Sequence, residues 1–218
     1  MNDAVRQQKE RALWDKQASA YDRRNLKMYK HAYDLSVRKT QTILSPDHKV
    51  LEIGCGTGII ALGIAPSVES VVATDLSPQM VAVAENKAKD ASIHNVDFQV
   101  CDGYTLPFDD QSFDVALLFN VLHFTKEPAT LLREAHRLLK SDGYLVGATD
   151  CYAEPVPLPV RLMLGIQRLL NLIGVIPFMW YYETEDLYRL FEECSFGIVE
   201  TEVLHPAPVN YYFCAKKA

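Results

Sequence analysis

The sequence predicts an α/β fold with a doubly wound, mostly parallel seven-stranded sheet and an antiparallel C-terminal hairpin at the edge. Three observations predict it. Short apolar runs rich in Val, Ile, Leu and Phe alternate with helical patterns, a glycine-rich turn follows the first run, and two further runs close the chain around a proline-containing connection. Near-continuous apolar strands are typical of a parallel sheet that helices cover on both faces.

The N-terminal part of the chain is expected to be helical over about 4–44. Leu13, Trp14, Ala18 and Tyr21 recur there at three- and four-residue steps, which is the spacing of one helix face. Five strands are then expected at 48–53, 69–75, 96–101, 113–119 and 143–149.

Local signals mark where the intervening helices begin and end. Ser77 followed by Pro78 predicts a capped helix start. A helix over 128–140 carries leucines on one face, and Asp142-Gly143 is expected to end a helix before the fifth strand.

The C-terminal part contains a helical insertion and a hairpin. Residues 155–180 are strongly apolar and rich in proline, and a helix is expected at about 184–194. The runs 197–204 and 209–215 have only a short connection, which joins antiparallel neighbours. We therefore expect one domain over 1–218, divided into an N-terminal helical cap (1–45), a cofactor-binding core (46–150), an apolar helical insertion (151–183) and a C-terminal helix with a sheet-edge hairpin (184–218).

Composition narrows the class of protein. The chain has 218 residues, of which 49% are apolar and 23% are charged, as in an ordinary globular domain. A net charge of −6 argues against nucleic acid as a partner, because phosphate binding needs clustered cations. The polar N-terminus and the dispersed cysteines and histidines predict a cytoplasmic protein without disulfides or a metal site.

The glycine-rich turn lies in VLEIGCGTGII, residues 50–60. Its glycines are Gly54, Gly56 and Gly58, and Ile59 stands where the dinucleotide fingerprint requires a third glycine. No Lys-Ser or Lys-Thr follows, so the phosphate-binding P-loop is also excluded. The short turn therefore suits a ligand whose polar end is small and carries no phosphate.

The expected strand ends carry the other candidate ligand groups. Asp75 follows the second strand at the position where an acid binds ribose hydroxyls, and Asp102 after the third is placed to accept from an adenine amine. Asn120 ends the fourth strand. Ribose, adenine and a small charged tail without phosphate together describe S-adenosylmethionine.

Five stretches in order carry a resemblance to a known family. They are Trp14-Asp15-x-x-Ala18-x-x-Tyr21-Asp22, VLEIGCGTG, VVATDLSPQM, CDGYTLPFDDQSFD, and FNVLHF followed by LLREAHRLLKSDGYLV. The chain resembles the class I S-adenosylmethionine-dependent methyltransferases, most of all the ubiquinone/menaquinone-biosynthesis group, over about 14–149. This resemblance implies a Rossmann-like fold and S-adenosylmethionine as cofactor. Ser141-Asp142-Gly143 departs from the family's usual Pro-Gly-Gly.

The resemblance also implies roles for residues near the glycine turn. Gly54 and Gly56 leave room for the methionine part of the cofactor, and the Gly54 carbonyl accepts from its ammonium group. Glu52 supports the turn and its positively charged ligand, and Asp75 binds both ribose hydroxyls. A competing interpretation makes Glu52 only a helix cap.

Further implied contacts surround the adenine and the methyl end. Leu76 and Met80 sandwich the adenine, although both also fit a plain core. Asp102 accepts from the adenine amine, and the Gly103 amide faces the ring. The remaining two implied contacts come from Asn120, below the ribose–methionine junction, and from Tyr21, which closes over the cofactor.

The expected function is methyl transfer to a small, lipophilic acceptor at oxygen, sulfur or carbon. His123 is the candidate base, with a pocket-shaping role as the equal alternative. The alternatives for the whole chain are a catalytically idle S-adenosylmethionine-binding protein and, less favoured, an NAD-dependent dehydrogenase. For the insertion at 155–180 we rank an acceptor-site lid first, then a peripheral membrane contact, then a homodimer contact.

Overall fold

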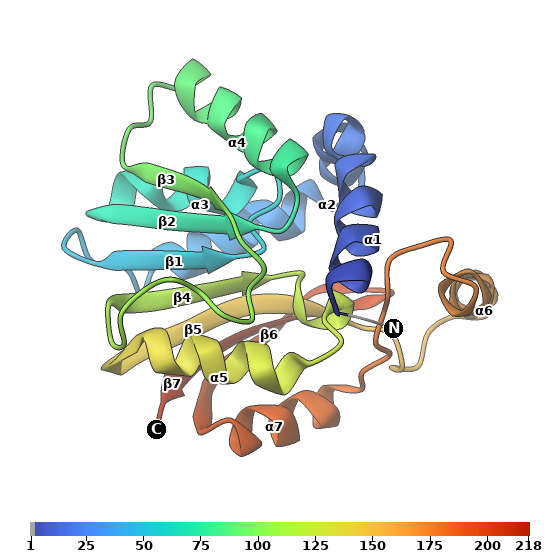
Figure 1. Ribbon diagram of the computed structural model, residues 1–218. Coiled ribbons are helices and arrows are strands. Elements are labelled where there is room, and N and C mark those ends of the chain that lie inside the picture. The colour runs from blue at the N-terminus through green and yellow to red at the C-terminus, as the bar shows by residue number, and fades with distance from the viewer. Residues whose placement is uncertain (1–2) are drawn as a thin grey trace.

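A computed structural model describes residues 3–218 of the chain, with side chains from residue 7 onward. Its seven-stranded sheet has the order β3-β2-β1-β4-β5-β7-β6 (Figure 1). The first five strands pair in parallel, and β7 pairs antiparallel with β5 and β6. The strands are β1 (Lys49–Ile53), β2 (Ser70–Asp75), β3 (Val96–Val100), β4 (Phe113–Phe119), β5 (Leu139–Cys151), β6 (Phe196–Pro206) and β7 (Val209–Lys217). This architecture confirms the expected fold class, including the hairpin at the edge.

Helices cover both faces of the sheet. On one face Leu132 of α5 and Phe191 of α7 enter the core, and on the other face Ile64 of α3 packs near Val37 of α2. Figure 1 shows α1 across the carboxyl ends of the central strands and α6 standing apart from the sheet. The helices are α1 (Asp3–Asp15), α2 (Ala18–Gln41), α3 (Ile59–Ile64), α4 (Pro78–Asp90), α5 (Pro128–Leu138), α6 (Leu158–Leu172) and α7 (Thr184–Glu193), with 3-10 turns η1 (Ala65–Ser67) and η2 (Leu122–Phe124).

Two local predictions have different outcomes. The cap at α4 is confirmed, because the Ser77 hydroxyl accepts from the Met80 amide at 3.1 Å. The helix stop at Asp142-Gly143 is wrong, because α5 already ends at Leu138 and both residues lie within β5. Lys217 donates to two carbonyls at this junction, those of His136 and Leu139, each at 2.7 Å. A side chain distant in sequence thus satisfies the helix end where the chain enters the strand.

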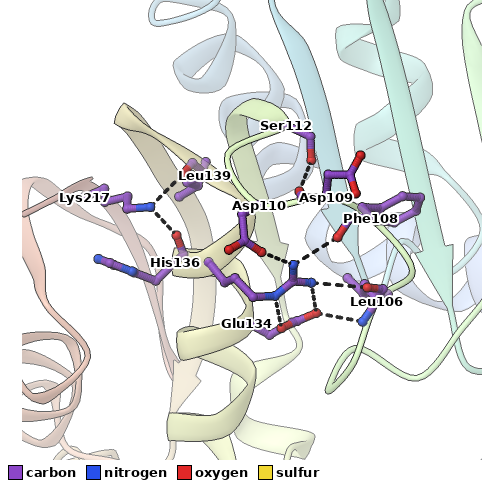
Figure 2. Close-up of polar contacts among 10 residues, drawn as sticks. Leu106, Phe108, Asp109, Asp110, Ser112, Glu134, His136, Leu139 and Lys217 are labelled. Carbon is purple, nitrogen blue, oxygen red and sulfur yellow. Dashed lines mark hydrogen bonds and ion pairs between the residues drawn. The ribbon is translucent and has the colours of Figure 1, made fainter.

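An arginine on α5 holds the loop between β3 and β4 in place (Figure 2). Arg137 contacts both carboxylate oxygens of Glu134, at 2.9 and 2.7 Å. It also donates to the Phe108 carbonyl at 3.0 Å and to Asp110 at 2.6 Å. Glu134 in turn accepts from the Leu106 amide at 2.7 Å, and the arginine lowers the pKa of Glu134. The planar guanidinium thereby joins three points of one loop to one helix.

We expect Arg137→Ala to lower the free energy of unfolding by about 1–3 kcal/mol, because it leaves the Glu134 carboxylate and the loop carbonyls without their charged partner. Arg137→Lys keeps the charge but loses the planar fork, so most of the loss is expected to remain. Urea denaturation measures the change. Arg133→Ala, on the exposed side of the same helix, is the matched control, and equal stability of the two alanine variants would contradict this role.

Candidate functional site

The glycine turn after β1 is held against the end of β2. Gly54, Gly56 and Gly58 all have positive φ, at 75°, 52° and 73°. A Cβ at Gly54 would lie 2.4 Å from a Val121 methyl. A larger residue at this position would therefore clash with Val121 and would also strain the backbone at positive φ. The Gly54 amide donates to the Thr74 carbonyl at 2.7 Å. The turn is therefore shaped by backbone bonds and leaves open space beside Gly56.

Asp75 closes this arrangement from the end of β2. One carboxylate oxygen accepts from the Gly56 amide and the other from the Ser77 amide, both at 2.8 Å. Burial raises the pKa of Asp75, and these two amides act in the opposite direction. Each carboxylate oxygen keeps acceptor capacity beyond one bond. Asp75 is therefore suited to accept from a pair of ligand hydroxyls.

A cavity of about 150 Å³ lies at the carboxyl ends of β1, β2 and β4, and we call it the first cavity. Every cofactor residue expected from the sequence except Glu52 lines it: Tyr21, Gly54, Gly56, Asp75, Leu76, Met80, Asp102, Gly103 and Asn120. The topology reverses direction between β1 and β4, which is where open α/β sheets bind ligands. These residues, from five separate segments of the chain, thus meet at one place.

Glu52 does not line this cavity. Its side chain is buried, and burial raises its pKa to about 8, with the Ala61 amide of α3 acting to lower it. The carboxyl group points toward the start of α3, so Glu52 does not contact a ligand in the first cavity, and its support of the turn stays a prediction. The helix-cap interpretation describes its position.

The helix α1 closes the first cavity with contacts that the sequence did not predict. Gln7 donates to Asp102 at 2.5 Å, and the Ser77 hydroxyl donates to Asp15 at 2.6 Å. Trp14 lines the cavity and packs edge-on against Phe124, with ring centroids 4.9 Å apart. The motif containing Trp14 and Asp15 was the available signal, but it assigned no role to them. An adenine amine that donates to Asp102 would therefore bond to the same carboxylate as the Gln7 side chain.

A second cavity of about 390 Å³ adjoins the first. Trp14, Tyr21, Asn120 and Phe124 line both. Its other walls come from α2, from the ends of β5 and β7, and from the insertion, which contributes Gln167, Leu170, Ile176, Pro177 and Met179. The two cavities therefore form a pair with a common wall.

His123 lines the second cavity with an almost fully buried ring. Its Nδ1 lies 3.0 Å from the Thr149 hydroxyl and accepts from the Asp150 amide at 3.2 Å. Burial lowers the pKa of His123, and the Asp150 charge partly offsets this. The ring is consequently neutral at pH 7. Its role as a base stays a prediction.

The insertion turns both polar and apolar side chains toward the second cavity. Gln167 and Asn171 face inward, where they donate to the Met179 sulfur at 3.1 Å and to the Pro177 carbonyl at 3.2 Å. Leu162, Leu169 and Ile173 are exposed, so these apolar side chains do not cover the second cavity. The reason is that the polar side chains find backbone and sulfur partners beneath the helix.

Comparisons with known proteins identify the class. Residues 51–147 match the family model described as "Methyltransferase domain". The chain is 31% identical over 156 residues to an uncharacterized methyltransferase, YcgJ, of Bacillus subtilis, covering 72% of this chain and 60% of that protein. It is 29% identical over 201 residues to a demethylmenaquinone methyltransferase of Tropheryma whipplei, covering 85% and 82%.

A solved structure agrees in fold. The possible histamine N-methyltransferase of Thermotoga maritima superposes with a TM-score of 0.71 at 22% identity, covering 95% of this chain and 99% of that one. Residues 51–147 therefore carry a methyltransferase domain. Its cofactor is S-adenosylmethionine, and the first cavity fits it because a buried carboxylate, a second acid and an open glycine turn line one space.

We expect Asp75→Ala to weaken S-adenosylhomocysteine binding by about 2–4 kcal/mol, because two charge-assisted hydrogen bonds are lost. Isothermal titration calorimetry measures the change. Asp97→Asn, an exposed acid on β3, is the control for altered net charge. Unchanged affinity in a folded Asp75→Ala protein would remove this residue from the site.

Proposed function

We propose that the protein transfers a methyl group from S-adenosylmethionine to a small lipophilic acceptor in the second cavity. The observation that carries this proposal is the common wall of the two cavities, made by Trp14, Tyr21, Asn120 and Phe124. Cofactor and acceptor in these spaces would be neighbours, as a direct displacement requires. The cofactor supplies an activated methyl group, so the chain mainly has to position the acceptor and exclude water.

Quinol-type compounds are the acceptor class that we propose. Several relatives are named demethylmenaquinone or ubiquinone/menaquinone methyltransferases. Aromatic and apolar side chains are frequent in the second cavity, among them Met28, Tyr29, Tyr33, Leu170 and Met179. Such a lining suits a flat ring with an apolar substituent.

The loop after α6 closes the second cavity, which supports the proposal that the insertion at 155–180 is a lid. Met179 is buried, and the Trp180 amide donates to the His123 carbonyl at 2.7 Å. Leu170 lines the cavity from α6 itself. The insertion therefore covers the second cavity, where we place the acceptor, and not the first cavity, where we place the cofactor.

Release of S-adenosylhomocysteine with a short-chain demethylmenaquinol tests the function. Turnover separates an enzyme from an idle binding protein, and NADH binding, which we expect to be absent, would favour the dehydrogenase alternative.

We expect Leu170→Ser to raise the acceptor KM about tenfold, from roughly 1–2 kcal/mol of lost apolar burial, without changing S-adenosylhomocysteine affinity. Leu169→Ser, one residue away on the exposed side, is the matched control. Equal KM values for the two variants would contradict the lid.

The outer face of α6 is a candidate contact with an anionic membrane surface. It exposes large apolar side chains, namely Leu158, Leu162, Met163, Ile166, Leu169, Leu172 and Ile173. Arg161 and Arg168 stand one above the other beside this face, and no Asp or Glu occurs between 155 and 182. An apolar stripe flanked by arginines is typical of helices that lie in a membrane interface. Within the described residues, no helix is long and apolar enough to cross a membrane.

We expect the protein to sediment with phosphatidylglycerol vesicles but not with phosphatidylcholine vesicles, and to dissociate as salt rises. Replacing Arg161 and Arg168 by Gln is expected to weaken binding about 30-fold, at roughly 1 kcal/mol per charge. A concentration-dependent increase in size without vesicle binding, abolished by Leu162→Ser with Leu169→Ser, would favour the homodimer contact instead.

A further inference from the structure

A polar cluster lies at the end of β5, on the wall of the second cavity. It contains Asp150, Tyr152 and Asn210, and nothing in the sequence motifs points to it. We propose that Asp150 binds the hydroxyl group of the acceptor and takes its proton, so that the acceptor is a phenol or an enol. This inference rests on the proposed function and names the substrate class of its acceptor site.

The carboxylate of Asp150 is held in a defined position. One oxygen accepts from the Asn210 amide group at 2.7 Å, and the other accepts from the Tyr152 hydroxyl at 2.6 Å. Asn210 lies opposite Asp150 on β7, because the two strands pair in that register. The Asp150 side chain is still 22% exposed, so the group keeps access to the cavity.

The same hydrogen bonds connect Asp150 to the cofactor side. The Asn210 amide group also donates to the Asn120 side chain at 2.9 Å. Asn120 lines both cavities and has a φ of 58°, which places it at the turn directly after β4. Asp150 is thus held by the wall across which the methyl group has to pass.

The charge pattern of the second cavity also favours Asp150 as the proton acceptor. Among the described residues that line this cavity, Asp150 is the only carboxylate. Burial and the nearby Asp150 charge raise the pKa of Tyr29, Tyr33 and Tyr152, so these phenols stay protonated. A protonated phenol can donate a hydrogen bond but cannot remove a proton from the acceptor.

The arrangement of His123 leaves it a positioning role. A neutral imidazole accepts a hydrogen bond at one nitrogen only. Its Nδ1 accepts from the Asp150 amide, so the proton resides on Nε2, which lies 3.8 Å from an Asp150 carboxylate oxygen. The free lone pair that a base needs is therefore already used. We therefore assign His123 a positioning role, through the hydrogen bond that its Nδ1 accepts from the Asp150 amide.

The proposed step conserves atoms and charge. The acceptor O–H bond breaks, its proton goes to an Asp150 oxygen, and the electron pair stays on the acceptor. The acceptor oxygen, or a ring carbon conjugated with it, bonds to the methyl group, and the electron pair of the broken sulfur–methyl bond stays on sulfur. After transfer to carbon, the displaced ring proton moves to the oxygen and restores the phenol.

Two naphthalenes that differ only at oxygen test the binding role. The fluorescence of 1-naphthol and of 1-methoxynaphthalene reports their affinity for the protein saturated with S-adenosylhomocysteine. We expect at least tenfold tighter binding of 1-naphthol, and we expect Asp150→Ala to abolish this preference with S-adenosylhomocysteine affinity unchanged. Asp142→Asn is the matched control, because Asp142 lies on the same strand with its side chain 93% exposed. A preference that survives Asp150→Ala, or is absent from the unsubstituted protein, overturns the inference.

Turnover tests the proton transfer itself. Asp150→Asn keeps an accepting oxygen at the site but takes no proton, so we expect kcat with short-chain demethylmenaquinol to fall about 100-fold while KM changes little. An unchanged kcat overturns the base role. Failure of the unsubstituted protein to methylate this acceptor would contradict the proposed function alone, because the naphthol comparison still decides whether Asp150 binds a hydroxyl.

Discussion

The junction between the glycine turn after β1 and the end of β2 is the constraint on which the site depends. Backbone amides of Gly54 and Cys55 donate to the Thr74 carbonyl, and the next amide, that of Gly56, donates to Asp75. These bonds require the positive φ angles of the turn. They also place a carboxylate in a buried position, where ligand hydroxyls that donate to it stabilise its charged form. Turn, acid and cavity thus form one unit.

The other walls of the first cavity pack against this unit from outside. Helix α1 hydrogen-bonds to Ser77 after β2 and to Asp102 after β3. Arg137 holds the loop that follows β3 through two of its carbonyls. Each contact joins segments that lie far apart in the chain. The cover over the first cavity therefore depends on strand ends that are already in register, because the helix contributes only side chains to the cavity.

The second cavity is built differently, from α2, from the long insertion and from the ends of β5 and β7. Leu164 and Met179 are buried, whereas neighbouring leucines of α6 face outward. The inward polar groups of this helix bond to its own following loop. One element therefore presents a cavity wall on one side and an apolar surface on the other. That division fits an acceptor which is itself lipophilic.

The sequence by itself determined the fold class, the hairpin at the sheet edge and the strand-end residues that line the first cavity, such as Asp75, Asp102 and Asn120. These follow from apolar runs, from the glycine turn and from acids at strand ends, all of which are local patterns. Tertiary structure decided where Glu52 points, where α5 ends, which face of α6 is inward, and that Asp150 meets Asn210. Each of these depends on a partner distant in the chain, such as Lys217 for the helix end. Periodicity cannot identify such partners, because it describes the face of an element but not what packs against it.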